Sequence, residues 1–151
     1  MAVPQFGDAE AGRTYVDRPA AFGIAGQGGR VALVRVSKAG HGPWLDLPGG
    51  AIDPGEDGPA AVVREFGEET GLKIAAGVEF ARADQMFINT DGAAYNNRAG
   101  FFVVRVVDEA AELKVEDDHE LVWVDPDAAV RGLRHDAHAW AVAAWLRRLK
   151  P

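Results

Sequence analysis

The sequence contains no cysteine and no long apolar run. Without cysteine the chain has no disulfide, no thiolate metal site and no cysteine nucleophile, and a cytoplasmic location fits best. No apolar stretch approaches the roughly 18 residues that a membrane-spanning helix needs. The first residues also lack the basic and apolar regions of a secretory signal. We therefore expect a cytoplasmic protein with no membrane partner.

Positive charge is also scarce. Lys and Arg number 16 against 23 Asp and Glu, which gives a formal net charge of −7. Basic residues cluster only at Arg147, Arg148 and Lys150, whereas a protein that binds nucleic acid usually presents a basic patch. We expect no nucleic-acid partner. An acidic protein can still bind phosphates when a divalent cation lies between the negative groups, so the positions of the acids matter more than their number.

The chain has the size of one domain, with 151 residues, a mass of 16.1 kDa and a hydrophobic fraction of 48%. This composition is sufficient for a core and excludes a disordered chain. We find no internal repeat and no linker. The sequence predicts a loose N-terminal lead-in over residues 1–16 and a single domain over residues 17–150.

Hydrophobic periodicity predicts a mixed α/β protein. A glycine-rich turn at 27–29 joins two expected strands, 21–24 and 31–36, and Lys38–Pro43 is expected to be a loop. Further expected strands are 44–47, 78–83, 86–89, 100–107 and 120–124. Asp125 opens a short helix that Gly132 ends, and a last helix spans about 136–149. A mixed sheet with helices on both sides buries these elements.

One expected helix has clear boundaries. Asp57 or Gly58 can cap its N-terminus, Pro59 lies where its missing N–H is not needed, and Gly71 ends it. Val62 and Phe66, with Ala61 or Val63, are expected to form its buried stripe.

This helix carries three glutamates on one face. Glu65, Glu68 and Glu69 follow the i, i+3, i+4 spacing, so their carboxylates lie together and repel one another. The only nearby cation is Arg64. Hard divalent cations such as Mg²⁺ prefer clustered oxygen ligands. Upstream, the Pro48-Gly49-Gly50 loop lets the backbone approach a ligand closely.

The segment 50–72, GAIDPGEDGPAAVVREFGEETGL, resembles the signature of the Nudix hydrolases, G-x5-E-x7-R-E-U-x-E-E-x-G-U with U apolar. It matches at every specified position: Gly50, Glu56, Arg64, Glu65, Phe66, Glu68, Glu69, Gly71 and Leu72. The order of the expected elements is also similar to the α/β/α sandwich of that family.

The resemblance implies hydrolysis of a nucleoside diphosphate linked to another group, with Mg²⁺ or Mn²⁺ required. It implies that Glu65, Glu68 and Glu69 bind the metal, with the Gly50 carbonyl as a further ligand. Glu65 is alternatively the general base or its orienting group. Arg64 would orient a glutamate, and Glu56 would support either the metal or the junction between loop and helix.

Candidates outside the motif are less specific. Glu120 is a candidate for a further metal ligand, because it precedes an expected strand within a run of acids. A solvated loop is the alternative. His119 is expected to make a local hydrogen bond, and His135 and His138 to cap the last helix or lie at the surface.

Aromatic residues provide candidates for substrate binding. Trp44 either stacks on a base or anchors a strand edge, and Phe87, Tyr95 and Asn96 are expected to border the pocket. Trp140 and Trp145 are expected in the core. Arg18 and Arg98 are either phosphate contacts or surface charges.

The small-molecule substrate that fits best is a (deoxy)nucleoside triphosphate or an oxidised nucleotide, hydrolysed to the monophosphate and pyrophosphate. An ADP-ribose or nucleotide-sugar pyrophosphatase is the alternative. A nucleotide-binding sensor without catalysis and an interaction module are hypotheses of other classes. The protein is expected to be a monomer or a homodimer.

Overall fold

The computed structural model describes residues 2–149. The described elements, in chain order, are β1 (Gln5–Phe6), β2 (Val16–Gln27), β3 (Arg30–Lys38), β4 (His41–Asp46), β5 (Gly49–Ala51), α1 (Gly58–Thr70), β6 (Leu72–Ile88), β7 (Ala94–Glu109), the 3₁₀ turn η1 (Ala111–Leu113), β8 (His119–Val124), α2 (Pro126–Gly132) and α3 (Asp136–Arg148). No helix among them is long and apolar enough to cross a membrane.

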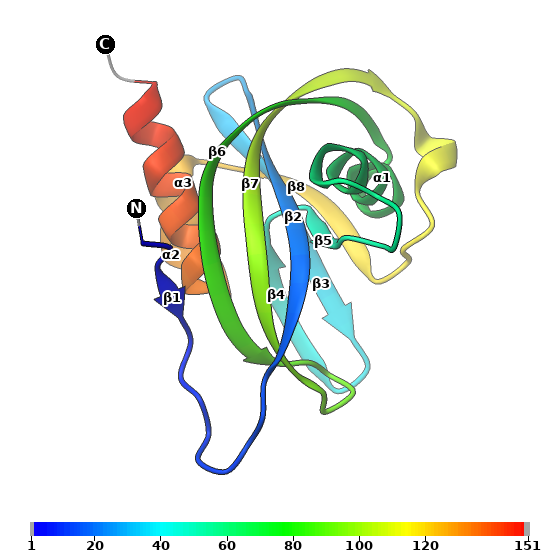
Figure 1. The fold of residues 1–151 in the computed structure, drawn as a ribbon. Helices are drawn as coiled ribbons and strands as arrows, with labels where there is room; N and C mark the ends of the chain where they lie inside the picture. The colour runs from blue at the N-terminus through cyan, green and yellow to red at the C-terminus, as the bar shows by residue number, and fades with distance from the viewer. Residues whose placement is uncertain (1, 150–151) are drawn as a thin grey trace.

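The strands form one curled mixed sheet between helices, which confirms the α/β sandwich expected from the sequence. Its order is β1-β6-β7-β2-β3-β4, with β5 paired to β2 and β8 paired to β3. β2 runs parallel to β7 and forms the predicted hairpin with β3 through Gly28 and Gly29, both with positive φ. α1 covers one face and α2 with α3 cover the other (Figure 1).

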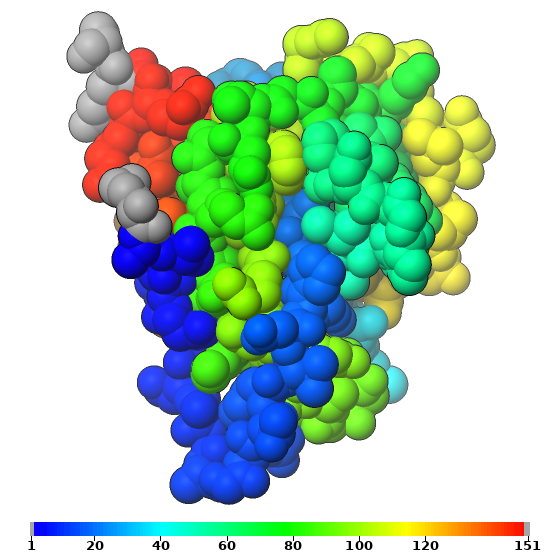
Figure 2. Space-filling model, in the orientation of Figure 1, coloured from blue at the N-terminus to red at the C-terminus, as the bar shows by residue number. Residues whose placement is uncertain are grey.

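Alternating residues of the central strands supply two cores. Phe22 and Ile24 of β2 face α3 and join Phe101, Val142 and other residues, whereas Ala21 and Ala25 face α1. In the space-filling view, side chains of β6 and β7 lie between the two helical layers (Figure 2). Both faces of β2 are therefore buried over much of its length.

α1 begins and ends where the sequence predicts. Asp57 is the N-cap, and its carboxylate accepts a hydrogen bond of 2.9 Å from the Ala60 N–H. Gly71 ends the helix with a φ of 74°. A Cβ on Gly67 would lie 3.2 Å from Leu113, so this glycine lets η1 pack closely on the helix. The packing places the segment before β8 against α1.

The structure differs from the expected elements in three places. Residues 72–88 form one long strand, β6, because its pairing with β7 continues through bulges near Ala76 and Glu79. The N-terminal 16 residues, expected as a loose lead-in, include β1, which pairs parallel to β6. The expected loop at 38–43 instead contains the start of β4. Of the two alternatives for the buried stripe of α1, Ala61 is buried and Val63 is exposed, because the core lies on the side of the helix that Ala61 shares with Val62 and Phe66.

Candidate active site

Arg64 lies at the centre of the acidic residues of α1. Its Nη1 donates to Glu65 Oε1 at 3.0 Å and to Glu68 Oε2 at 3.2 Å. Its Nη2 donates to the Ala51 carbonyl at 3.3 Å, which connects the helix to β5. Charge-assisted hydrogen bonds of this kind hold carboxylates in defined directions. The guanidinium of Arg64 is therefore placed between the glutamates.

Glu56 is bound to the same guanidinium through both of its oxygens. Arg64 Nε donates to Oε2 at 2.7 Å and Nη2 donates to Oε1 at 2.9 Å. The Asp53 N–H also donates to Oε1 at 2.9 Å. These hydrogen bonds, above all those from Arg64, lower the pKa of Glu56 to about 2. In this structure Glu56 supports the junction between the loop and the helix.

Glu69 is the buried member of the glutamate group, with 6% of its surface exposed. The Gly49 N–H donates to its Oε1 at 3.0 Å, and His119 Nε2 lies 3.5 Å from its Oε2. Burial raises the pKa of Glu69 well above its ordinary range, and the neighbouring charge of Glu65 adds to the effect. Burial also raises the pKa of Glu65, which is within hydrogen-bonding reach of Glu69. Without a cation this pair favours holding a proton.

Gly49 and Gly50 are required by close contacts. A Cβ on Gly49 would lie 2.2 Å from the Ala21 carbonyl oxygen, and its φ is 144°. A Cβ on Gly50 would lie 3.1 Å from Glu65 Oε1. The loop therefore brings the backbone against the carboxylates, as the glycines of the motif predicted.

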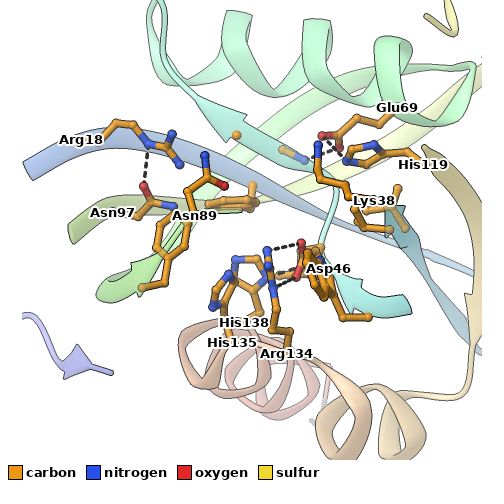
Figure 3. A pocket seen from close by; sticks show the side chains of 18 residues that line it. Arg18, Lys38, Asp46, Glu69, Asn89, Asn97, His119, Arg134, His135 and His138 are labelled. Atoms are coloured by element: carbon orange, nitrogen blue, oxygen red, sulfur yellow. Dashed lines mark hydrogen bonds and ion pairs between the residues drawn. The ribbon is translucent and has the colours of Figure 1, made fainter. Parts of the chain in front are cut away.

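A pocket of about 150 Å³ begins at Glu69 and extends towards α3 (Figure 3). Its walls come from the strands β2 to β8, the last turn of α1 and the start of α3. The polar side chains that line it are Arg18, Lys38, Trp44, Asp46, Glu69, Asn89, Asn97, His119, Arg134, His135 and His138. The pocket thus joins the acidic helix to a polar region on the other side of the sheet.

Two buried histidines lie at the α3 end of the pocket. His138 Nδ1 accepts a hydrogen bond from the Leu47 N–H at 3.2 Å, which leaves the proton of the neutral ring on Nε2. Burial lowers the pKa of His138 well below its ordinary value and lowers that of His135 to about 3. Both rings are therefore neutral at pH 7. The expectation of a surface position was wrong, because both histidines are buried where the start of α3 packs on the sheet. His135 does hold the N-cap position of α3, although its side chain makes no capping hydrogen bond.

Asp46, Arg134 and Trp44 form a second polar group. Arg134 binds Asp46 through two hydrogen bonds of 3.1 and 2.7 Å, and its guanidinium lies 4.2 Å from the Trp44 ring centroid. Burial raises the pKa of Asp46 despite this partner. The Trp44 Nε1 is buried without a hydrogen-bond partner among the described residues. Trp44 therefore lines the pocket and also packs against Arg134, which is paired with Asp46.

The remaining expected residues are divided between the pocket and the surface. Phe87 lines the pocket, and Tyr95 lies beneath Arg18. Asn96 points away and contacts Gln5 and Asp17, so Asn97 takes the place expected for it. The pocket lining does not include Arg98, Trp140 or Trp145. Arg98 is paired with Asp17 and Asp84 at the surface, Trp145 is buried in the core and Trp140 is partly buried beside Phe6.

The structure does not bring Glu120 to the pocket. Its side chain is exposed and pairs with Arg35 at 2.8 Å. Alternation along β8 places the preceding residue, His119, inside instead. His119 makes the expected local hydrogen bond, 2.7 Å from Nδ1 to Asp118 Oδ1.

Glu116, Asp118 and His119 form a described group whose ligand atoms all lie within 4.8 Å of one another. Asp118 is already bound on both oxygens, by Lys38 at 2.9 Å and by His119. This group lies next to Glu69 through His119. His119 and Glu69 both line the pocket, so this group adjoins one end of it.

The comparisons with known proteins agree with this geometry. The family model of the NUDIX domain matches residues 15–148. The chain therefore belongs to the NUDIX family, and it is a hydrolase. Its fold is similar to that of a NUDIX hydrolase from Nitrosomonas europaea, with a TM-score of 0.74 and 20% identity over 87% of this chain and 90% of that one.

Two relatives differ in the substrates that their names state. An RNA pyrophosphohydrolase of Sphingopyxis alaskensis is 28% identical over 116 residues, 68% of this chain and 73% of its own length. A Bacillus subtilis (strain 168) protein, provisionally named an 8-oxo-dGTP diphosphatase, is 58% identical over 33 residues. That second match spans only 22% of either chain.

Proposed function

We propose that this protein hydrolyses a (deoxy)nucleoside triphosphate or an oxidised nucleotide to the monophosphate and pyrophosphate, with Mg²⁺ as the cofactor. Mn²⁺ is the alternative cation. The observation that carries the proposal is the pocket that begins at Glu69 and ends at His135 and His138. Its volume of about 150 Å³ is below the roughly 300–1,000 Å³ of sites that enclose a whole drug-sized ligand. It suits one nucleobase, with the phosphates extending from it towards the glutamates.

The residues present fit a hard divalent cation. Glu65 and Glu69 lie within hydrogen-bonding reach of each other, and the pKa of each is raised by burial, so a cation can replace the proton that they favour. Glu65, Glu68, Glu69 and the Gly50 carbonyl would hold it. When bound, such a cation would neutralise phosphate charge and promote attack by water on phosphorus.

The chain's own residues organise this site. Arg64 holds Glu65 and Glu68 in fixed directions and binds both oxygens of Glu56. The Gly49 N–H fixes one oxygen of Glu69, so the other oxygen faces Glu65 and His119. With the carboxylates prearranged, little reorganisation is required when substrate binds.

The first experiment is release of pyrophosphate or phosphate with Mg²⁺ across a substrate panel. The panel contains the (deoxy)nucleoside triphosphates, 8-oxo-dGTP, ADP-ribose, UDP-glucose, a dinucleoside tetraphosphate and a 5′-triphosphorylated RNA. Glu68→Gln is measured in parallel. Turnover of the triphosphates that is lost in the variant supports the proposal. Turnover of ADP-ribose or UDP-glucose alone favours the nucleotide-sugar alternative, and turnover of the RNA alone favours an RNA substrate.

A sensor is distinguished by binding without turnover. If wild-type protein binds nucleotides in the presence of Mg²⁺ but cleaves no member of the panel, the proposal of a triphosphate hydrolase is wrong. The proposal also includes a cytoplasmic location and a monomer or homodimer. Cell fractionation and sedimentation equilibrium test these two points.

A further inference from the structure

Three cations line the pocket, and two of them are paired with carboxylates. Lys38 Nζ lies 2.9 Å from Asp118, and Arg134 binds both oxygens of Asp46. Arg18 differs, because no carboxylate of the described residues lies within 4.0 Å of its guanidinium nitrogens. It is therefore the pocket cation whose charge the protein does not neutralise by direct contact.

Neutral groups hold Arg18 in place. Its Nε donates a hydrogen bond of 2.9 Å to Oδ1 of Asn97, whose side chain is buried (Figure 3). Its guanidinium lies 4.3 Å from the ring centroid of Tyr95 and 5.5 Å from that of Phe87. These contacts fix the direction of the guanidinium and occupy only Nε among its nitrogens. Both terminal nitrogens are left without a partner among the described residues.

An unpaired, half-buried guanidinium is suited to an anionic ligand. Burial lowers the pKa of Arg18, and electrostatic interactions with Tyr95, Asp91 and Glu65 offset part of that effect. Arginine nevertheless stays charged in proteins. Its two terminal nitrogens form a planar fork that matches two phosphate oxygens. A phosphate that binds here would accept the hydrogen bonds that the partly buried guanidinium cannot make to water.

We propose that Arg18 binds the phosphate attached to the substrate's nucleoside, so that the pocket recognises a nucleoside 5′-monophosphate unit. The inference rests on the proposed function and deepens it. Arg18 lines the same pocket as Trp44 and His138, whereas Glu65 and Glu68 lie outside that lining. The cation bound by the glutamates would then engage phosphates farther from the nucleoside, and Arg18 the nearer one.

The test measures binding of nucleoside monophosphates in EDTA by calorimetry. The probes are AMP, GMP, CMP, UMP and dGMP, each compared with its nucleoside. Arg18→Gln is expected to weaken the monophosphate that binds wild type best by about 10- to 100-fold, because a charge-assisted contact is lost. Binding of the matching nucleoside should be unchanged. Arg18→Lys, which keeps the charge and loses the fork, is expected to give an intermediate effect.

Arg98→Gln is the matched control, because Arg98 also lies in a central strand, β7, but pairs with Asp17 and Asp84 at the surface. It should bind the monophosphate as wild type does. The inference is overturned if Arg18→Gln binds the monophosphate normally, if it weakens the binding of nucleoside and monophosphate equally, or if no probe binds wild type.

With a triphosphate that is turned over, Arg18→Gln should raise KM at least about 10-fold and change kcat much less. Arg18-dependent binding without any turnover would reject the proposed reaction and leave this inference intact.

Discussion

Arg64 and Glu56 are joined by two parallel hydrogen bonds, 2.7 Å from Nε to Oε2 and 2.9 Å from Nη2 to Oε1. This pair links the loop after β5 to α1 and sets the plane of the guanidinium. The remaining nitrogen, Nη1, is then directed at Glu65 and Glu68. Arg64 thus connects Glu56, at the junction between loop and helix, to the glutamates that would hold the cation.

Arg64→Lys should lower kcat at least about 10-fold, because an ammonium group cannot make the two parallel bonds and still reach both glutamates. The free energy of unfolding should fall by about 1–2 kcal/mol. Steady-state kinetics and urea denaturation measure these effects. Arg35→Lys is the control, since Arg35 pairs with Glu120 at the surface and should change stability by less than about 0.5 kcal/mol. Equal effects of the two substitutions would show that Arg64 has no special role.

Glu69→Gln should abolish turnover and stabilise the metal-free protein. The buried carboxyl of Glu69 has a raised pKa, so removing its ionisation should increase the free energy of unfolding at pH 7. Glu68→Gln should lower kcat at least ~10²-fold without this gain, because Glu68 is only half-buried and contacts Arg64. Denaturation in EDTA at pH 7 checks the difference. A Glu69→Gln protein that is less stable than wild type would contradict the argument.

Gly49→Ala and Gly50→Ala should separate folding from activity. At Gly49 the added Cβ would lie 2.2 Å from a backbone oxygen and the φ is 144°, so we expect a loss of at least about 3 kcal/mol of stability. At Gly50 the Cβ would lie 3.1 Å from the Glu65 carboxylate, which can move slightly. That variant should fold and lose activity. Thermal melts and kinetics distinguish them, with Gly28→Ala, where a Cβ meets open space, as a control for positive φ alone.

Stability should decrease below pH 6.5 because of the buried histidines. The pKa of His135 is about 3 in the folded protein, against about 6.5 for an unfolded chain. Between these values the unfolded chain binds a proton that the folded chain does not, so the free energy of unfolding falls as the pH falls. The slope is up to about 1.4 kcal/mol per pH unit for each such histidine.

His135→Gln should therefore show a shallower loss of stability than wild type between pH 6.5 and 4.5. Denaturant unfolding at each pH gives the slope, and His41→Gln, an exposed position on β4, is the control. The raised pKa of Glu69 acts in the opposite direction, so the difference between variant and wild type is the informative quantity. Parallel slopes in all three proteins would refute the prediction.

The acidic helix could be predicted from the sequence because it depends on local features. Asp57, Pro59 and Gly71 determine its ends, and the spacing of its glutamates places them on one face without reference to the rest of the chain. The fold class followed from the same kind of pattern.

The far side of the pocket could not be predicted because it depends on tertiary contacts. Arg134 reaches it because its backbone N–H donates a hydrogen bond to the Leu45 carbonyl. His138 reaches it because its ring accepts a hydrogen bond from the Leu47 N–H. Strand register decides which residue of β8 faces the pocket. β8 pairs His119 with Val36 and Glu120 with Arg35, so His119 faces the pocket and Glu120 faces solvent. A pattern of acids in the sequence does not contain that register.

The packing of α3 on the sheet also has a consequence for the order in which the site is made. Ribosomes deliver the N-terminal part of a chain first, so α1 with its glutamates emerges well before His135 and His138. Until the last helix follows, a nascent chain has the acidic group without the walls that select a ligand. Cation binding can therefore precede discrimination between nucleotides during biosynthesis, and selectivity arrives with the final helix.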